Sequence, residues 1–167
     1  DLGISRAPYQ PLLFPCDMRR GIPYRNRRTD SDWDDASKEW PAIQEQLDAQ
    51  SDTLAAIIYE PILQGAGGMR LYSPDLIRRM SHWADANRVF LIADEIASGM
   101  FRLGKPVAGD WVACRDANGG AGVVQPDFVL LSKGLTGGEL PLAAVIITDE
   151  IYRQFYADYS EGKSFLH

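Results

Sequence analysis

Residues 89–95 read Val-Phe-Leu-Ile-Ala-Asp-Glu, a run of apolar side chains that ends in two carboxylates. A short, uninterrupted apolar run is typical of a strand that is covered on both faces, as in parallel sheets. Similar runs occur at residues 54–59, which lead to Glu60, and at residues 128–131, which lead to Lys133. The sequence therefore predicts three buried strands, each of which ends beside a charged residue.

A helix is expected between the first two of these strands. The segment Ser73–Asp75 offers a capping hydroxyl, a proline for the first turn and a carboxylate that favours the positive end of the helix dipole. Apolar residues then recur with helical spacing over 76–84, and Asn87 is suited to the helix end. Another helix is expected from Trp40 and a fourth strand over 142–147. This order predicts an α/β fold, with a mostly parallel sheet flanked by helices.

The charge distribution argues against a nucleic-acid partner. The chain has 167 residues and a formal net charge of −6, whereas binding to phosphates requires concentrated positive charge. A basic cluster over residues 19–28 is followed directly by an acidic run over residues 30–35. Adjacent blocks of opposite charge are typical of a solvated surface on which the charges compensate each other.

Few residues are available for metal binding or nucleophilic catalysis. Cys16 and Cys114 lie far apart, and His82 and His167 are the only histidines. A zinc site or a Ser-His-Asp triad is therefore hard to build, and two thiols in a reducing compartment are favoured over a disulfide. Neither a signal peptide nor an apolar run of membrane-spanning length is recognisable. We expect a cytoplasmic protein that does not associate with membranes.

Three segments carry organisational information. Residues 1–36 contain several prolines and are expected to be irregular, apart from a short strand at 12–14. Residues 114–124 include a glycine cluster and are expected to form a surface insertion. The chain begins with Asp1 and stops at His167 without a helix or turn signal. We therefore expect residues 1–167 to be part of one domain, truncated at both ends.

The three charged strand ends form the candidate site. In open α/β sheets, ligands bind beyond the carboxyl ends of the strands, where Glu60, Asp94 and Lys133 are expected. A carboxylate and an amine at such an edge are costly unless they have a function or a partner. The residues alone leave two interpretations open: a functional site, or a structural arrangement in which Asp94 or Glu60 caps the following helix and Lys133 forms an ion pair with either carboxylate.

Three motifs resemble those of the class III pyridoxal-phosphate-dependent aminotransferases. They are residues 57–71 (IIYEPILQGAGGMRL), residues 92–96 (IADEI) and residues 131–138 (LSKGLTGG). Their order, spacing and position at strand ends all match the family. The resemblance implies part of the large, cofactor-binding domain of a fold-type-I transferase, pyridoxal 5′-phosphate as the cofactor, and a homodimer in the intact protein.

The resemblance also implies roles for individual residues. Lys133 matches the lysine that binds the cofactor aldehyde covalently and moves the proton of the reacting carbon. Asp94 matches the aspartate that keeps the pyridine nitrogen of the cofactor protonated. Ile96 would pack against a face of the ring if the backbone after Asp94 stays extended, with core filling as the alternative.

Two further positions are less closely tied to the cofactor. Arg102 aligns with an arginine near the substrate carboxylate, although Met100 and Phe101 replace the usual Phe-Gly of the family; the alternative is a surface arginine. Glu60 is expected to have a structural role. The glycine-rich segment 64–68 is expected to form a tight turn, since it does not open a helix directly after the strand.

Within the class, residues 64–74 and 161–167 are most similar to members that aminate 8-amino-7-oxononanoate with S-adenosylmethionine in biotin biosynthesis. Lysine is an alternative amino donor for this acceptor. Another class III enzyme for an ω-amino acid or a diamine remains a second possibility, and a non-catalytic α/β scaffold a third. Since several family site residues lie outside this stretch, we expect the 167 residues alone to be inactive.

Overall fold

The computed structural model of the chain describes residue 22 and residues 24–115 and 121–156. The short strand expected at residues 12–14 and the closing segment 161–167 lie outside the described residues. None of the helices in the described part is both long and apolar enough to cross a membrane.

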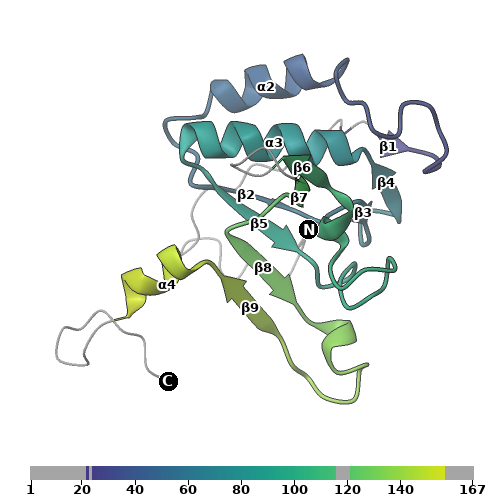
Figure 1. Cartoon of the computed structure of the whole chain (residues 1–167), viewed down its shortest axis with the longest axis vertical. Coiled ribbons are helices and arrows are strands. Elements are labelled where there is room, and N and C mark those ends of the chain that lie inside the picture. The colour runs from purple at the N-terminus through teal and green to yellow at the C-terminus, as the bar shows by residue number, and fades with distance from the viewer. Residues whose placement is uncertain (1–21, 23, 116–120, 157–167) are drawn as a thin grey trace.

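A four-stranded sheet forms the centre of the molecule (Figure 1). Its strands, in spatial order, are β2 (Ala56–Tyr59), β5 (Phe90–Asp94), β8 (Phe128–Leu131) and β9 (Ala144–Ile147). Strands β2, β5 and β8 are parallel to one another, whereas β9 pairs with β8 in the antiparallel direction. The prediction of an α/β fold with a mostly parallel sheet is therefore confirmed, although the fourth strand begins two residues later than expected.

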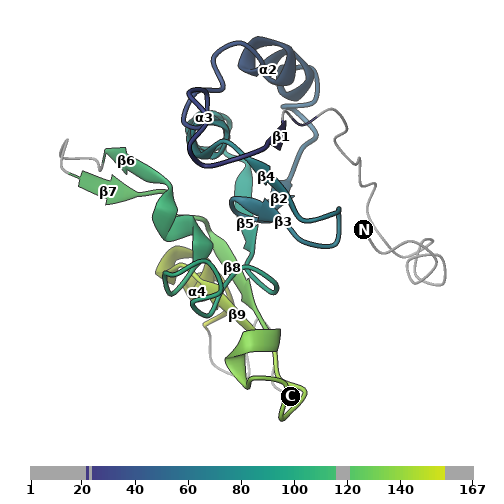
Figure 2. The ribbon, with the colours of Figure 1, turned by 90° about the vertical axis from the view of Figure 1, so that its right-hand side faces the viewer.

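Helix α3 (Pro74–Asn87) connects β4 (Arg70–Tyr72) to β5 and begins as the sequence predicts. The Ser73 hydroxyl accepts a hydrogen bond from the amide of Asp75 at 3.1 Å, which satisfies one of the free donors of the first turn. The helix ends after Asn87, where Arg88 adopts a left-handed conformation. Helix α2 (Trp40–Asp48) packs against the outer side of α3, as Figures 1 and 2 show.

The helices bury one face of the sheet. Leu91 of β5 lies in the same core as Ile77 of α3, which is completely inaccessible to solvent, and Ala93 of β5 is buried as well. A connected core joins α2, α3 and the sheet and comprises Ala36, Trp40, Ile43, Ile62, Tyr72, Leu76, Ile77, Trp83, Ala84, Val89, Leu91, Val112 and Val124. Burial of these apolar side chains is the main force that holds the sheet and helices together.

The opposite face of the sheet is open in the described part of the chain. Ile58, Phe90 and Val145 point to this face and are 56%, 47% and 61% exposed, respectively. The expectation of strands covered on both faces is therefore wrong for the described residues. The continuous apolar runs are real, but α2 and α3 both lie on the Leu91 side. Apolar residues on the open face include Phe128, whose ring meets that of Phe90 edge to face at 5.8 Å.

Smaller elements surround the central sheet. Strands β1 (Tyr24–Arg25), β4 (Arg70–Tyr72) and β3 (Leu63–Gln64) form an antiparallel sheet, and β6 (Ala113–Arg115) pairs with β7 (Ala121–Val123). The remaining elements are the 3-10 helices η2 (Ala108–Trp111) and η3 (Lys133–Leu135) and the helix α4 (Asp149–Phe155). The expected surface insertion, residues 114–124, coincides with the β6–β7 pair. Its centre, residues 116–120, lies outside the described residues, and its nature as an insertion stays a prediction.

Candidate active site

The carboxyl ends of β2, β5 and β8 lie at one edge of the sheet (Figure 1). Asp94, the last residue of β5, pairs with Leu130 of β8, and the amide of Glu95 donates a hydrogen bond to the Leu130 carbonyl oxygen at 3.0 Å. Lys133 follows shortly after Leu130 on the same strand end. The parallel register thus places Asp94 and Lys133 on adjacent strands, at the edge where α/β sheets bind their ligands.

Asp94 has a half-buried side chain that belongs to the open face of the sheet. Its Oδ1 accepts a hydrogen bond from the amide of Ile96 at 3.0 Å, so the carboxylate caps the turn that follows β5. Its other oxygen has no hydrogen-bond partner among the described residues. Asp94 therefore caps a turn rather than the helix considered from the sequence, and this leaves one carboxylate oxygen free to accept a proton or a hydrogen bond.

Lys133 begins η3 and is exposed. Its ammonium group forms no ion pair or hydrogen bond with Asp94, Glu60 or any other residue in the part of the chain that the structure describes. The backbone of Lys133 has a φ of 36°, in the left-handed region that side chains other than glycine rarely adopt. Such strained positions are concentrated at functional sites. The ion pair considered as a structural explanation for Lys133 is thus not observed.

Ile96 lies half-buried in a turn that directly follows β5. The strand ends at Asp94, and the chain turns over residues 96–100, with the amide of Gly99 donating to the Glu95 carbonyl oxygen at 2.8 Å. The extended backbone on which the Ile96 prediction depended therefore does not continue. Contact between Ile96 and a cofactor ring stays a prediction.

Arg102 is exposed and lies in the loop that links this turn to η2. Its guanidinium has no ion pair within the described residues. The two preceding residues, Met100 and Phe101, both have positive φ values, of 53° and 65°. The departure from the family motif thus coincides with a strained loop. Binding of a substrate carboxylate by Arg102 stays a prediction.

Glu60 and the glycine-rich segment behave as a structural unit. An oxygen of the Glu60 carboxylate accepts a hydrogen bond from the amide of Gly65 at 2.9 Å. The amides of Gly68 and Met69 both donate to the Gly65 carbonyl oxygen, at 3.1 and 3.0 Å. These bonds close a tight turn between β3 and β4, as expected from the sequence.

Glu95 is a prominent residue of this edge that the sequence analysis missed. Its side chain is buried at 2% exposure, and its carboxylate accepts hydrogen bonds from the Ser98 hydroxyl and the Gly109 amide, both at 2.8 Å. Burial, and to a smaller extent the nearby Glu95 carboxylate, raises the pKa of the Tyr59 phenol far above its ordinary value. The available signal was a second carboxylate after a buried strand, followed by a small hydroxyl residue three positions later.

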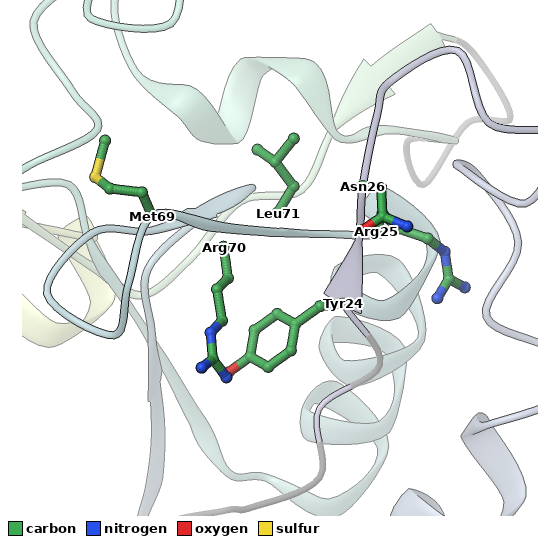
Figure 3. Close-up of a pocket in the computed structure, with 6 residues that line it drawn as sticks. All are labelled: Tyr24, Arg25, Asn26, Met69, Arg70 and Leu71. Carbon is green, nitrogen blue, oxygen red and sulfur yellow. The ribbon is translucent and has the colours of Figure 1, made fainter.

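A hollow of about 340 Å³ lies away from the strand ends, between β1 and β4 (Figure 3). It is lined by Tyr24, Arg25, Asn26, Met69, Arg70 and Leu71. The Arg70 guanidinium lies over the Tyr24 ring at 4.9 Å from its centre, while the Arg25 side chain points away from both. None of the predicted site residues lines this hollow, so it does not belong to the candidate site.

The residues at the sheet edge suit pyridoxal phosphate. The cofactor needs an amine for its aldehyde and an anionic acceptor for its protonated ring nitrogen. Lys133 supplies an amine without a competing partner in the described part of the chain, and Asp94 supplies a carboxylate with one free oxygen. No group of three or more His, Cys, Asp or Glu side chains within the described ranges is arranged to hold a metal ion.

Comparison with known sequences gives a consistent assignment. The profile of the family described as aminotransferase class-III matches residues 11–166. An adenosylmethionine-8-amino-7-oxononanoate aminotransferase from Helicobacter pylori is 34% identical over 167 residues, covering 100% of this chain and 34% of its own length. The enzyme of the same name from Synechococcus elongatus is 40% identical over 157 residues, covering 91% of this chain and 33% of its own length. The chain thus spans about a third of the length of these relatives.

Solved structures with the same fold are aminotransferases as well. An (S)-enantioselective omega-transaminase from Thermomicrobium roseum matches with a TM-score of 0.62 and 30% identity, over 78% of this chain and 26% of the other. A taurine:2-oxoglutarate aminotransferase from Bifidobacterium kashiwanohense, solved in complex with PLP and glutamate, matches with a TM-score of 0.59 and 29% identity, over 71% and 24%. Taken together with the family match, these similarities show that the chain belongs to the class III aminotransferases, a family of pyridoxal-phosphate-dependent enzymes.

Proposed function

We propose that the intact protein transfers an amino group from S-adenosylmethionine to the ketone carbon of 8-amino-7-oxononanoate, giving 7,8-diaminononanoate for biotin biosynthesis. The observation that carries this proposal is the similarity of the chain to relatives that bear this activity in their names, at 34% identity over 100% of the chain and 40% identity over 91% of it. The matched region includes the strand ends that present Asp94 and Lys133.

We assign Lys133 and Asp94 as the residues that act on the cofactor. When bound, pyridoxal phosphate supplies an aldehyde that takes up an amino group and a ring that withdraws electrons. The Lys133 amine would attach the cofactor and then move a proton to and from the carbon that gains or loses the amino group. The free oxygen of Asp94 would hold the proton at the ring nitrogen. Support comes from their positions on adjacent parallel strands.

Arg102 and Ile96 complete the proposal. Both substrates carry a carboxylate, which the planar guanidinium of Arg102 suits through two parallel hydrogen bonds. Ile96 would limit the space beside the ring with its apolar side chain. Both residues lie in the segment that leaves the same sheet edge as Asp94. The proposal also includes a homodimer and a location in the cytoplasm. The exposed apolar face of the sheet supports the homodimer.

A second candidate is a class III aminotransferase for another ω-amino acid or diamine. The observation that favours it is that solved structures similar to this chain include an omega-transaminase and an ornithine aminotransferase. The usual Phe-Gly is also replaced by Met100 and Phe101, which both have positive φ values, in the loop that carries Arg102. The third interpretation, a non-catalytic scaffold, predicts that the protein does not attach pyridoxal phosphate.

One experiment distinguishes the three candidate functions. The intact protein is incubated with pyridoxal phosphate, and its visible absorbance is recorded before product formation is measured with each substrate pair. The proposal expects an absorbance band and 7,8-diaminononanoate from S-adenosylmethionine, with a kcat/KM at least about 10-fold above that with β-alanine and pyruvate or with ornithine and 2-oxoglutarate. Lysine is included as an alternative donor. A band with the opposite preference supports the second candidate, and a missing band supports the scaffold.

A further inference from the structure

The turn formed by residues 95–100 is packed tightly against the β3–β4 turn on one side and against the segment that follows β8 on the other. On one side, a Cβ added to Gly65 would lie 3.3 Å from the Cβ of Ala97. On the other side, a Cβ added to Gly134 would lie 2.7 Å from the Cβ of Met100, closer than real Cβ atoms approach. Gly134 directly follows Lys133. The turn therefore rests against the backbone that carries the amine of the candidate site.

The same turn also contacts the covered side of β8. A Cβ added to Gly99 would lie 2.7 Å from the Glu95 carbonyl oxygen and 3.2 Å from a methyl group of Leu131. Glycine at this position thus allows the turn to close onto Glu95 and β8 at once. The turn thus directly follows Asp94 at one end and lies against Gly134, the residue after Lys133, at the other.

Glu95 determines the shape of this turn. Its carboxylate bonds to the Ser98 hydroxyl inside the turn and to the Gly109 amide at the start of η2, each at 2.8 Å. It is 2% exposed and forms no ion pair within the described residues. A buried carboxylate without a cation partner is costly for stability. Buried charged groups of this kind are concentrated at functional sites, and Glu95 lies next to the edge where the ligand is expected.

We propose that Glu95 is a positioning residue for the cofactor site: its buried carboxylate fixes the turn over residues 95–100, and this turn sets the placement of Lys133 relative to Asp94 through its contact with Gly134. Glu95 touches neither the cofactor nor the substrate in this proposal. Glu95 acts through the backbone of the turn, which connects to Asp94 and contacts Gly134. The proposal rests on the function proposed above, because it assumes that Lys133 and Asp94 serve the same cofactor.

The first test compares Glu95→Ala with Glu95→Gln in the intact, cofactor-loaded protein. Glutamine can accept from the Gly109 amide and donate to the Ser98 hydroxyl, so it retains both bonds without the charge. For Glu95→Ala, we expect the pH midpoint of the visible absorbance band to shift by at least about half a unit. We also expect kcat to fall at least about 10-fold while KM changes by less than about twofold. Glu95→Gln should stay close to wild type in each property.

Asp75→Ala serves as the matched control. Asp75 is another carboxylate that accepts hydrogen bonds, from the Ala36 amide and, as ion pairs, from Arg78 and Arg79, and it lies on α3 away from the strand ends. The Asp75→Ala variant should have a lower midpoint of thermal unfolding and an unchanged pH midpoint of the absorbance band. If Glu95→Ala behaves like this control, Glu95 is only structural and the proposal is overturned. An equal shift in Glu95→Gln would assign the effect to charge and would overturn positioning by hydrogen bonds.

A second test does not require the Glu95 variants to fold. Gly134→Ala should force the turn and the Lys133 backbone apart and shift the absorbance midpoint, while Met100→Gly removes the atom that it meets. The double variant should recover at least half of the shift. Independent effects in the double variant would contradict coupling between the turn and Lys133. Absence of the absorbance band from the cofactor-loaded wild-type protein would instead reject the proposed function itself. Failure of the positioning role and failure of the proposed function can therefore be distinguished.

Discussion

Asp94 pairs with Leu130 in parallel register, and the chain continues from Leu130 through Leu131 and Ser132 to Lys133. This register, rather than any direct contact, brings the carboxylate and the amine to one edge of the sheet. The side chains form no ion pair with each other. Because they are not paired, the carboxylate and the amine are each available for a different end of one cofactor ring.

Replacement of Lys133 by alanine should abolish the visible absorbance band of the cofactor-loaded protein and reduce kcat at least about 1,000-fold, since the same amine is expected to attach the cofactor and move the proton. Absorbance and steady-state kinetics of the intact protein check this. Lys105→Ala is the matched control, because the Lys105 amine bonds to the Asp110 carbonyl oxygen and lies over the Trp111 ring. It should retain the band. A Lys133→Ala protein with a normal band and activity would exclude the assignment.

Asp94→Asn should leave the turn intact and slow the chemistry. Asparagine retains an oxygen that can accept from the Ile96 amide, so the bond seen at 3.0 Å is preserved. It lacks the negative charge that holds a proton at the ring nitrogen. We expect kcat to fall more than about 100-fold, with cofactor binding weakened much less. Single-turnover rates and cofactor titration measure the two effects separately. Equal losses in both would indicate that Asp94 only binds the cofactor.

The sequence predicted the central strands and the capped helix well because each depends on local chemistry. The hydroxyl of Ser73, the proline after it and the charge of Asp75 act within one turn of α3. Similarly, the apolar run before Asp94 predicts a strand whatever its neighbours are. The parallel direction of β2 and β5 then follows from the strand–helix–strand order.

The features that the sequence did not predict depend on contacts between distant segments. The exposure of Ile58 and Phe90 depends on which side α3 packs, which the continuous apolar runs do not specify. The burial of Glu95 depends on the Gly109 amide, fourteen positions later. The end of β5 was predicted, but the turn that follows Asp94 was not. This turn, which leaves the Ile96 role unsettled, is held by hydrogen bonds in a segment that has no proline and no consensus turn pair.

Arg102→Ala should raise KM for a carboxylate-bearing substrate by about 10- to 100-fold, the loss of roughly one charge-assisted hydrogen-bonded pair. The attached cofactor should keep its absorbance, because Arg102 is not expected to contact the ring. Arg102→Lys should recover only part of the affinity, since an ammonium cannot bind a carboxylate with two parallel bonds. Kinetics with each substrate varied separately provide the measurement. An unchanged KM for both substrates would make Arg102 a surface residue.

Phe101→Gly should give a protein more stable than Phe101→Ala by about 1 kcal/mol. Phe101 has a φ of 65°, and its side chain is 65% exposed, so little burial is lost in either variant. Alanine keeps the strained conformation, whereas glycine adopts it without steric cost. Thermal or urea unfolding of the two variants checks the difference. Equal stability would show that the loop relaxes to a negative φ when the phenyl ring is removed.

The pH dependence of stability should include a contribution from Asp75. Burial alone would raise the pKa of this carboxyl, but the hydrogen bond from Arg79, the amide of Ala36 and the charges of Arg79 and Arg78 outweigh it and hold the pKa below its ordinary value of 3.8. A carboxyl with a lowered pKa in the folded state binds its proton more weakly there than in the unfolded chain. Its stabilisation is therefore complete above pH 3.8 and is lost as the pH falls through the lower folded value.

Asp75→Asn should consequently be less stable than wild type at pH 7 by about 1 kcal/mol, the usual size of such partly exposed interactions at a helix N-terminus. The difference should shrink as the pH is lowered below 3.8, because protonation then removes the same charge from the wild-type protein. Urea unfolding of both proteins at a series of pH values measures this. A difference that stays constant down to the lowest pH would mean that the charge of Asp75 does not provide the stabilisation.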